Sequence, residues 1–143
     1  FRWLHTVDDL RLAEKLSAAI QRNAQATLLN CLLQVNVSGE QSKSGLSPDQ
    51  VIPFIDDLLE LELPGLVWRG LMTIGVRGND SETRLAFAEL RKLADRIRQH
   101  TGLAEFDQLS MGMSDDYRAA IEEGATMVRV GSSIFGPRSY PSP

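Results

Sequence analysis

TLLNCLLQVNV, residues 27–37, is a nearly continuous apolar run of strand length. Strands of a parallel sheet whose two faces are both covered lose the alternation of polar and apolar side chains and take this composition. The run therefore predicts a parallel strand over Thr27–Val37, in a central position of its sheet.

Short apolar runs and segments of helical period alternate on both sides of this strand. The expected strands are Phe1–His5, Thr27–Val37, Leu66–Ile74, Gln108–Met111 and Met127–Gly131, and the expected helices are Asp8–Asn23, one that opens at Ser47, Glu82–His100 and Asp115–Glu123. Such alternation is typical of consecutive β/α units around a parallel sheet. We predict an α/β fold of about five units in a single domain, residues 1–143. The units either form an open sheet or trace an arc of a barrel.

The helix that opens at Ser47 has a clear start signal. Ser47 is expected as the N-cap, Pro48 takes a position where no amide donor is needed, and Gln50 can complete a capping box. Pro53 falls inside the same helix, where it removes a backbone donor and could shift or kink the helix.

Composition excludes several classes of function. A net charge of -4 and a pI near 5.1 argue against nucleic acid as a partner, because such binding needs a clustered cationic surface. Cys31 is the only cysteine, so no internal disulfide can form, and His5 and His100 lie too far apart in sequence for zinc-ligand spacing. No apolar stretch approaches the ~20 residues that span a bilayer. We expect a soluble protein of the reducing cytoplasm, without a membrane partner.

The segment SMGMSDD, residues 110–116, is the first candidate site. A strand is expected to end here, Gly112 permits close backbone approach, and Ser114 is placed to cap the next helix. The unpaired amides at a helix start favour an anion. An ordinary capped helix, with Asp115 and Asp116 in its first turn, is the alternative.

A second turn, at Gly131 and Ser132, follows the next expected strand. Parallel order places it beside the first turn, and two adjacent strand-end turns can hold one dianion, as in many barrel phosphate sites. Arg129 is a permanent cation inside the apolar strand, and an unpaired buried charge is costly. Its partner is either a carboxylate on a neighbouring element or an acceptor atom of a ligand.

Three longer motifs resemble a known family. They are QVNVSGEQSKSGL at 34–46, GLMTIG at 70–75 and LSMGMSDDYRAAIEEGATMVRVGSSIFGPR at 109–138. In register over essentially the whole chain, they are similar to the pyridoxal phosphate homeostasis proteins, which are relatives of the barrel domain of alanine racemase. The resemblance implies a partial (β/α)8 TIM-type barrel whose five units correspond to strands 4 to 8, with the first units missing.

The resemblance also implies a ligand and its contacts. Pyridoxal 5'-phosphate (PLP) would bind at the strand ends, and Arg129 would face its pyridine nitrogen. The residues around the phosphate would be Ser110, Gly112, Met113, Ser114, Gly131 and Ser132. The family is thought to store, buffer or hand over the cofactor rather than to turn over a substrate. PLP-dependent apoenzymes are therefore the implied partners, and no catalytic residue is expected.

The resemblance to the family is incomplete at the N-terminus. The lysine that forms the aldimine lies in the N-terminal units of family members, and the lysines present here are Lys15, Lys43 and Lys92. We therefore expect weak, noncovalent binding at best. The alternatives are an amino-acid racemase, which would require a further β domain with a catalytic tyrosine, an enzyme of phosphorylated metabolites, and an inert truncated scaffold.

Overall fold

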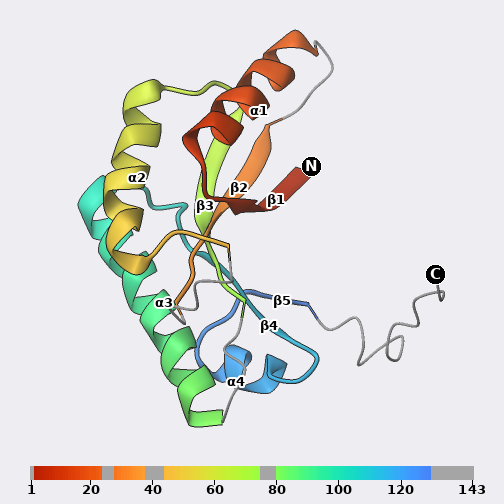
Figure 1. The fold of residues 1–143 in the computed structure, drawn as a ribbon, viewed down its shortest axis with the longest axis vertical. Helices are drawn as coiled ribbons and strands as arrows, with labels where there is room; N and C mark the ends of the chain where they lie inside the picture. The colour runs from red at the N-terminus through yellow and green to blue at the C-terminus, as the bar shows by residue number, and fades with distance from the viewer. Residues whose placement is uncertain (1, 24–27, 38–43, 75–79, 130–143) are drawn as a thin grey trace, which may run out of the picture.

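In the part of the chain that the structure describes, five parallel strands alternate with four helices. The computed structural model describes residues 2–23, 28–37, 44–74 and 80–129. The elements, in order, are β1 (Arg2–Val7), α1 (Leu10–Arg22), β2 (Leu29–Gln34), α2 (Pro48–Leu61), β3 (Leu66–Met72), α3 (Asp80–Thr101), β4 (Gln108–Met113), α4 (Tyr117–Glu122) and β5 (Met127–Arg129). A helix follows each of the strands β1 to β4, which confirms the predicted β/α units (Figure 1).

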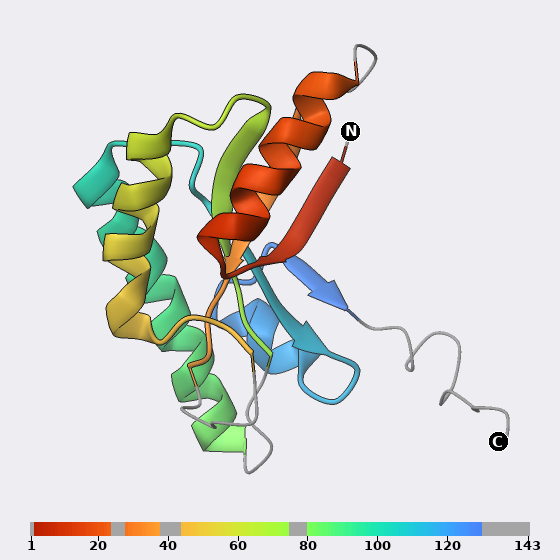
Figure 2. The ribbon, with the colours of Figure 1, turned by 45° about the horizontal axis from the view of Figure 1, so that its top comes forward.

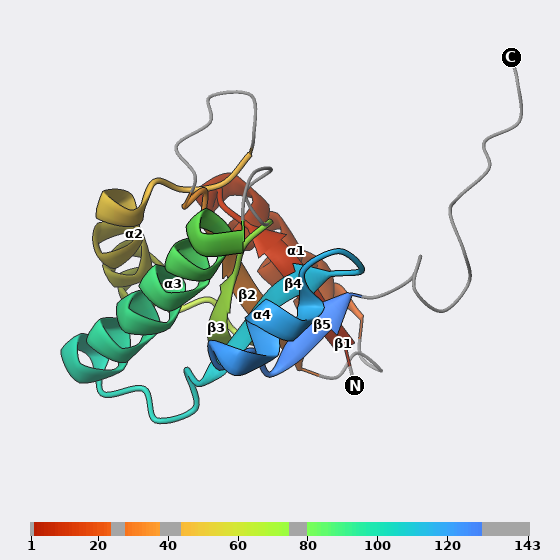
Figure 3. The same cartoon turned by 90° about the horizontal axis from the view of Figure 1, so that it is seen from below.

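The strands form one sheet in the order β1-β2-β3-β4-β5, and every neighbouring pair is parallel. Because each crossover advances by one strand in the same direction, right-handed connections place the helices on a single face. The helices follow the sheet in chain order, with α2 and α3 side by side (Figures 1 and 3). An open doubly wound sheet would carry helices on both faces. The chain is therefore an arc of a barrel, a half-barrel.

The expected strand boundaries are close to those observed. β2 lies between two parallel neighbours, as its apolar run predicted, but it ends at Gln34 rather than Val37. β4 continues two residues beyond Met111. α3 is longer than expected, from Asp80 to Thr101.

The start of α2 confirms the capping prediction. Ser47 is the N-cap, and its backbone N–H donates to the Gln50 side chain at 3.1 Å. Pro53 lies within α2, which runs without a break from Pro48 to Leu61. The proline therefore costs one backbone hydrogen bond without ending the helix.

The main core lies between the sheet and the helices. Its largest fully buried members include Phe87, Phe106, Ile55, Leu58, Leu90 and Ile97. Cys31 is buried in β2, and burial raises the pKa of its thiol to about 12, so the thiol is a packing group. Figure 2 shows α1 against the strands at the β1 side of the sheet. None of the helices in the described ranges is long and apolar enough to cross a membrane.

Candidate functional site at the strand ends

Polar groups at or just beyond the carboxyl ends of the strands form a continuous chain of hydrogen bonds. His5 in β1 shares a hydrogen bond of 2.9 Å between its Nδ1 and the Oγ of Ser110 in β4. The Ser110 carbonyl accepts from the Thr73 amide at 3.0 Å. The Thr73 carbonyl accepts from Nη2 of Arg129 at 3.0 Å. We call this chain of His5, Ser110, Thr73 and Arg129 the strand-end network.

Thr73 anchors the network to a further strand. Its hydroxyl is buried and donates to the carbonyl of Val35, just after β2, at 2.7 Å. Residues in or directly after all five strands are thereby linked at the edge where parallel α/β folds carry their sites. Both the position of this edge and its hydrogen bonds therefore indicate a candidate site.

The side chain of Arg129 has a donor group for which the described residues supply no hydrogen-bond acceptor. Its Nε is buried and lacks a hydrogen-bond partner among the described residues, while Nη2 is held by Thr73. Burial lowers the pKa of Arg129, and the charge of Asp116 opposes that shift. A guanidinium remains charged under these conditions, so the orphaned donor favours an acceptor atom from outside the network. Both partners considered for Arg129 stay predictions, because the Asp116 carboxylate acts on its charge while its Nε has no bonded acceptor among the described residues.

His5 lies close enough to Arg129 to respond to its charge. Burial of the ring and the Arg129 guanidinium both lower the pKa of His5. The ring is therefore neutral at neutral pH, and its Nδ1 can either accept from Ser110 or donate to it, depending on the tautomer.

Gly112 lets α4 approach the end of β4. Its φ is +100°, and an added Cβ would lie 2.5 Å from the Cβ of Ala120. Any side chain here would strain the backbone and push α4 away. The close approach at Gly112 is that of α4, so the glycine serves helix packing, and its role beside a ligand stays a prediction.

The start of α4 differs from the expectation. Asp116, rather than Ser114, is the N-cap, and its carboxylate accepts from the Met113 amide at 2.6 Å. A turn over 114–116 therefore separates β4 from a helix of only 6 residues. The carboxylate thus occupies the Met113 amide, one of the groups predicted to surround the phosphate. The prediction of an anion at the start of this helix is weakened, and Arg129 becomes the main indication of a ligand.

The remaining predicted site residues differ in their exposure to solvent. Met113 is exposed, and Ser114 is half-buried. Ser110 is completely buried, and its hydroxyl is engaged with His5. Gly131 and Ser132 lie outside the described residues, as does Lys43, so their expected roles stay predictions.

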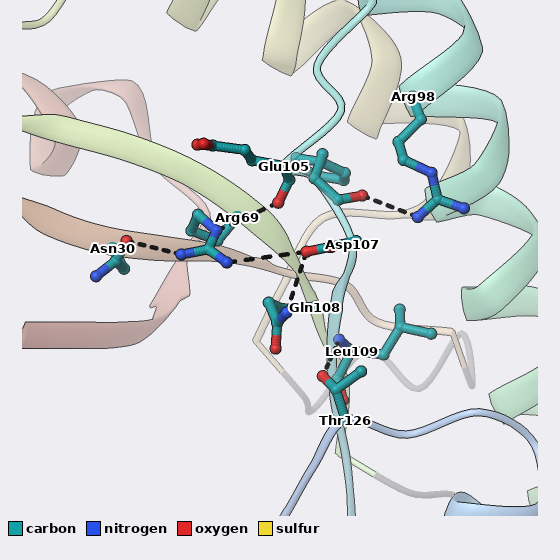
Figure 4. Close-up of polar contacts among 9 residues, drawn as sticks. Asn30, Arg69, Arg98, Glu105, Asp107, Gln108, Leu109 and Thr126 are labelled. Atoms are coloured by element: carbon teal, nitrogen blue, oxygen red, sulfur yellow. Dashed lines mark hydrogen bonds and ion pairs between the residues drawn. The ribbon is translucent and has the colours of Figure 1, made fainter.

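A second arginine near the opposite ends of the strands has a full set of contacts (Figure 4). Arg69 in β3 donates to Oδ1 of Asn30 at 3.3 Å and to the carbonyl of Glu105 at 3.2 Å. The guanidinium also lies 5.1 Å from the centre of the Trp3 ring and 3.9 Å from the Asp107 carboxylate. We call these contacts the Arg69 cluster, and they leave little for a ligand to supply.

His5 and Thr73 were not predicted as site residues. Thr73 stood in the motif GLMTIG, but its carbonyl, not its side chain, holds Arg129. His5 is 105 residues from Ser110, a separation that no local pattern connects. The available signal was position alone, because both residues stand at the ends of expected strands.

The fold and the polar strand ends define a β/α half-barrel with a candidate anion site. The family model described as "Alanine racemase, N-terminal domain" matches residues 2–139. The chain therefore belongs to the alanine racemase N-terminal domain family.

Similar proteins from several organisms support this assignment. The chain is 47% identical to a pyridoxal phosphate homeostasis protein of Pseudomonas aeruginosa, 43% identical to that of Escherichia coli and 39% identical to that of Homo sapiens. The matches cover 100%, 98% and 96% of this chain and 59%, 58% and 50% of the respective relatives. The chain thus spans between half and three fifths of these relatives.

Solved structures show the same arrangement of elements. PipY of Synechococcus elongatus matches with a TM-score of 0.84 in its structure without PLP and 0.82 in its structure with PLP bound, at 34% identity in both. The matches cover 95% of this chain and 62% and 61% of PipY. These comparisons confirm the expected partial barrel.

Proposed function

We propose that this chain binds pyridoxal 5'-phosphate at the strand ends and serves PLP homeostasis as a carrier or regulator. The single observation that carries the proposal is Arg129, a half-buried arginine whose buried Nε has no hydrogen-bond partner among the described residues. A ligand acceptor would satisfy that donor. The pyridoxal phosphate homeostasis relatives and the PLP-bound structure of PipY support the choice of ligand.

In this proposal, the site residues divide between the two ends of the ligand. Under the proposal, Arg129 faces the pyridine nitrogen, and Gly112 and Ser114 lie toward the phosphate, whereas the Met113 amide is held by the Asp116 carboxylate. Gly131 and Ser132 complete the phosphate site by motif position. We place Ser110 behind the ligand, because its buried hydroxyl is engaged with His5.

The position of Arg129 favours a carrier over a catalyst. When bound, the cofactor supplies an electron sink whose strength depends on a protonated pyridine nitrogen, and a permanent cation beside that nitrogen opposes protonation. We therefore propose a non-catalytic role, with PLP-dependent apoenzymes as recipients. We further propose that residues 1–143 act as one domain in the cytoplasm, which a free, buried Cys31 supports.

The test is a titration of the purified chain with PLP, followed by visible absorption. We expect saturable binding that borohydride does not convert to a covalent adduct in the wild type or in Lys43→Arg. Trapping that Lys43→Arg abolishes would overturn the noncovalent part of the proposal. The absence of saturable binding would overturn the proposal as a whole and favour an inert scaffold.

A second measurement separates the carrier from an enzyme. The PLP-loaded chain is mixed with an apoenzyme that requires PLP, and recovery of that enzyme's activity is followed with time. Racemisation of alanine is assayed in parallel. Transfer without racemisation is the expected result, and rapid racemisation would favour the enzyme instead.

A further inference from the structure

The bond between His5 and Ser110 crosses the concave face of the half-barrel. In the described sheet, β1 pairs with β2, whereas β4 pairs with β3 and β5. His5 and Ser110 therefore belong to strands that do not pair, yet their side chains meet at 2.9 Å. Only a curved sheet allows this contact, so the bond reports the curvature of the strand ends.

This bond acts on the same backbone that holds Arg129. Ser110 accepts from the Thr73 amide through its carbonyl, and Thr73 accepts from Arg129 through its own. The position of the Ser110 residue therefore fixes one end of the peptide segment that orients the guanidinium. A shift of Ser110 changes where the unpartnered Nε of Arg129 points.

We propose that His5 is a positioning residue of this site: by holding Ser110, it sets the orientation of the Arg129 guanidinium toward the ligand. The inference rests on the proposed function and adds a residue to it. His5 does not touch the ligand under this proposal, and its effect passes through Ser110 and Thr73.

The charges around His5 agree with such a role. The charge of Arg129 in β5 acts on the ring, and the carboxylate of Asp116, before α4, acts on Arg129. A neutral ring can hold the Ser110 hydroxyl without adding a second cation beside Arg129. A lysine or arginine at position 5 would lack this property.

The first test compares His5→Leu with His5→Asn. Leucine removes the hydrogen bond, whereas the asparagine amide can replace Nδ1 at a similar distance from the backbone. We expect the dissociation constant for PLP to rise about tenfold in His5→Leu, as for the loss of one hydrogen bond, and to stay within about threefold of wild type in His5→Asn. Far-UV circular dichroism and thermal unfolding establish that each variant folds.

His100→Leu is the matched control. His100 lies on α3 and bonds through Nε2 to the Asp56 carboxylate at 3.0 Å, away from the strand ends. It should bind PLP as the wild type does. Equal affinity of His5→Leu and His100→Leu would overturn the inference, while wild-type binding would leave the proposed function intact.

A double-mutant cycle tests the connection to Ser110. If His5 acts through Ser110, the effects of His5→Leu and Ser110→Ala on PLP affinity are not additive. The double variant then has the PLP affinity of the single variant that binds more weakly. Additive effects would show that His5 acts by another route and would overturn the inference.

A measurement without ligand keeps the test independent of PLP. NMR titration of the His5 ring gives its pKa in the wild type, in Ser110→Ala and in Arg129→Gln. We expect the His5 pKa to rise in Arg129→Gln, because a cation is removed, and to change in Ser110→Ala. Identical titration in all three proteins would overturn the geometry even if the chain binds no PLP.

Discussion

Two arginines of the same sheet, Arg69 in β3 and Arg129 in β5, have contrasting environments. Arg69 contacts the Asn30 side chain and the Glu105 carbonyl (Figure 4), and its guanidinium also lies over the Trp3 ring. Arg129 donates to one carbonyl and keeps a buried Nε without a partner in the described part of the chain. Proteins satisfy nearly all buried polar atoms, so this difference is the one expected under the proposed function, between an arginine that serves the scaffold and one that binds a ligand. Under that proposal, the carboxyl ends of the strands are the functional end.

Substitution of Gly70, next to Arg69, should have the largest effect. An added Cβ would lie 1.8 Å from the Gln108 carbonyl oxygen, where backbone must move. We expect Gly70→Ala to lower the free energy of unfolding by about 3 kcal/mol or more. The control is Gly102→Ala, whose Cβ meets nothing within 4 Å, although its φ is +74°. It should cost about 1 kcal/mol in urea unfolding. Equal losses would mean that backbone conformation, not the close approach of β3 to β4, decides the effect.

Arg129→Met should separate affinity from stability. We expect PLP affinity to fall by about 2 kcal/mol, because a charged hydrogen bond to the ligand is lost. The free energy of unfolding should change little, since methionine also removes the buried, unpartnered Nε. Binding titrations and urea unfolding give the two values. A large loss of stability with unchanged affinity would reverse the roles of the two arginines.

Arg69→Met should show the opposite behaviour. Loss of the contacts with Asn30, Glu105 and Trp3 should lower the free energy of unfolding by about 1.5 kcal/mol. PLP affinity should remain at the wild-type value. If Arg69→Met weakened PLP binding as much as Arg129→Met, the two ends of the strands would not be functionally distinct.

The pH dependence of stability should give the smallest effect. The pKa of His5 is lowered in the folded chain, so the unfolded chain binds more protons between that value and the ordinary pKa of about 6.5. Stability therefore rises with pH through this window and is lost on acidification below about 6.5. His5→Asn removes this contribution. Urea midpoints measured from neutral to mildly acidic pH should show a smaller decline in His5→Asn than in the wild type.

Much of the fold could be predicted from local signals. The apolar run over Thr27–Val37 predicted a parallel strand with neighbours on both sides, and Ser47 with Gln50 predicted the start of α2. Periodicity could not choose between an open sheet and an arc of a barrel. That choice depends on which face the helices occupy, a property of the assembled sheet that the alternation of elements does not encode.

The candidate site was only partly predictable. Arg129 stood out because a permanent cation is rare in an apolar strand. Its hydrogen bond to Thr73 and the contact between His5 and Ser110 depend on curvature, which brings together residues 56 and 105 positions apart. The start of α4 was misassigned because both Ser114 and Asp116 are good capping residues, and only the turn before the helix decides between them.

The chain of hydrogen bonds from β1 to β5 has a thermodynamic consequence for the first strand. A ligand that binds Arg129 in this position also stabilises the hydrogen bonds that run from Arg129 through Thr73 and Ser110 to His5. It therefore stabilises the attachment of β1 to the rest of the sheet. Amide hydrogen exchange along β1 should therefore slow when PLP is added, although under the proposal no atom of that strand contacts the ligand.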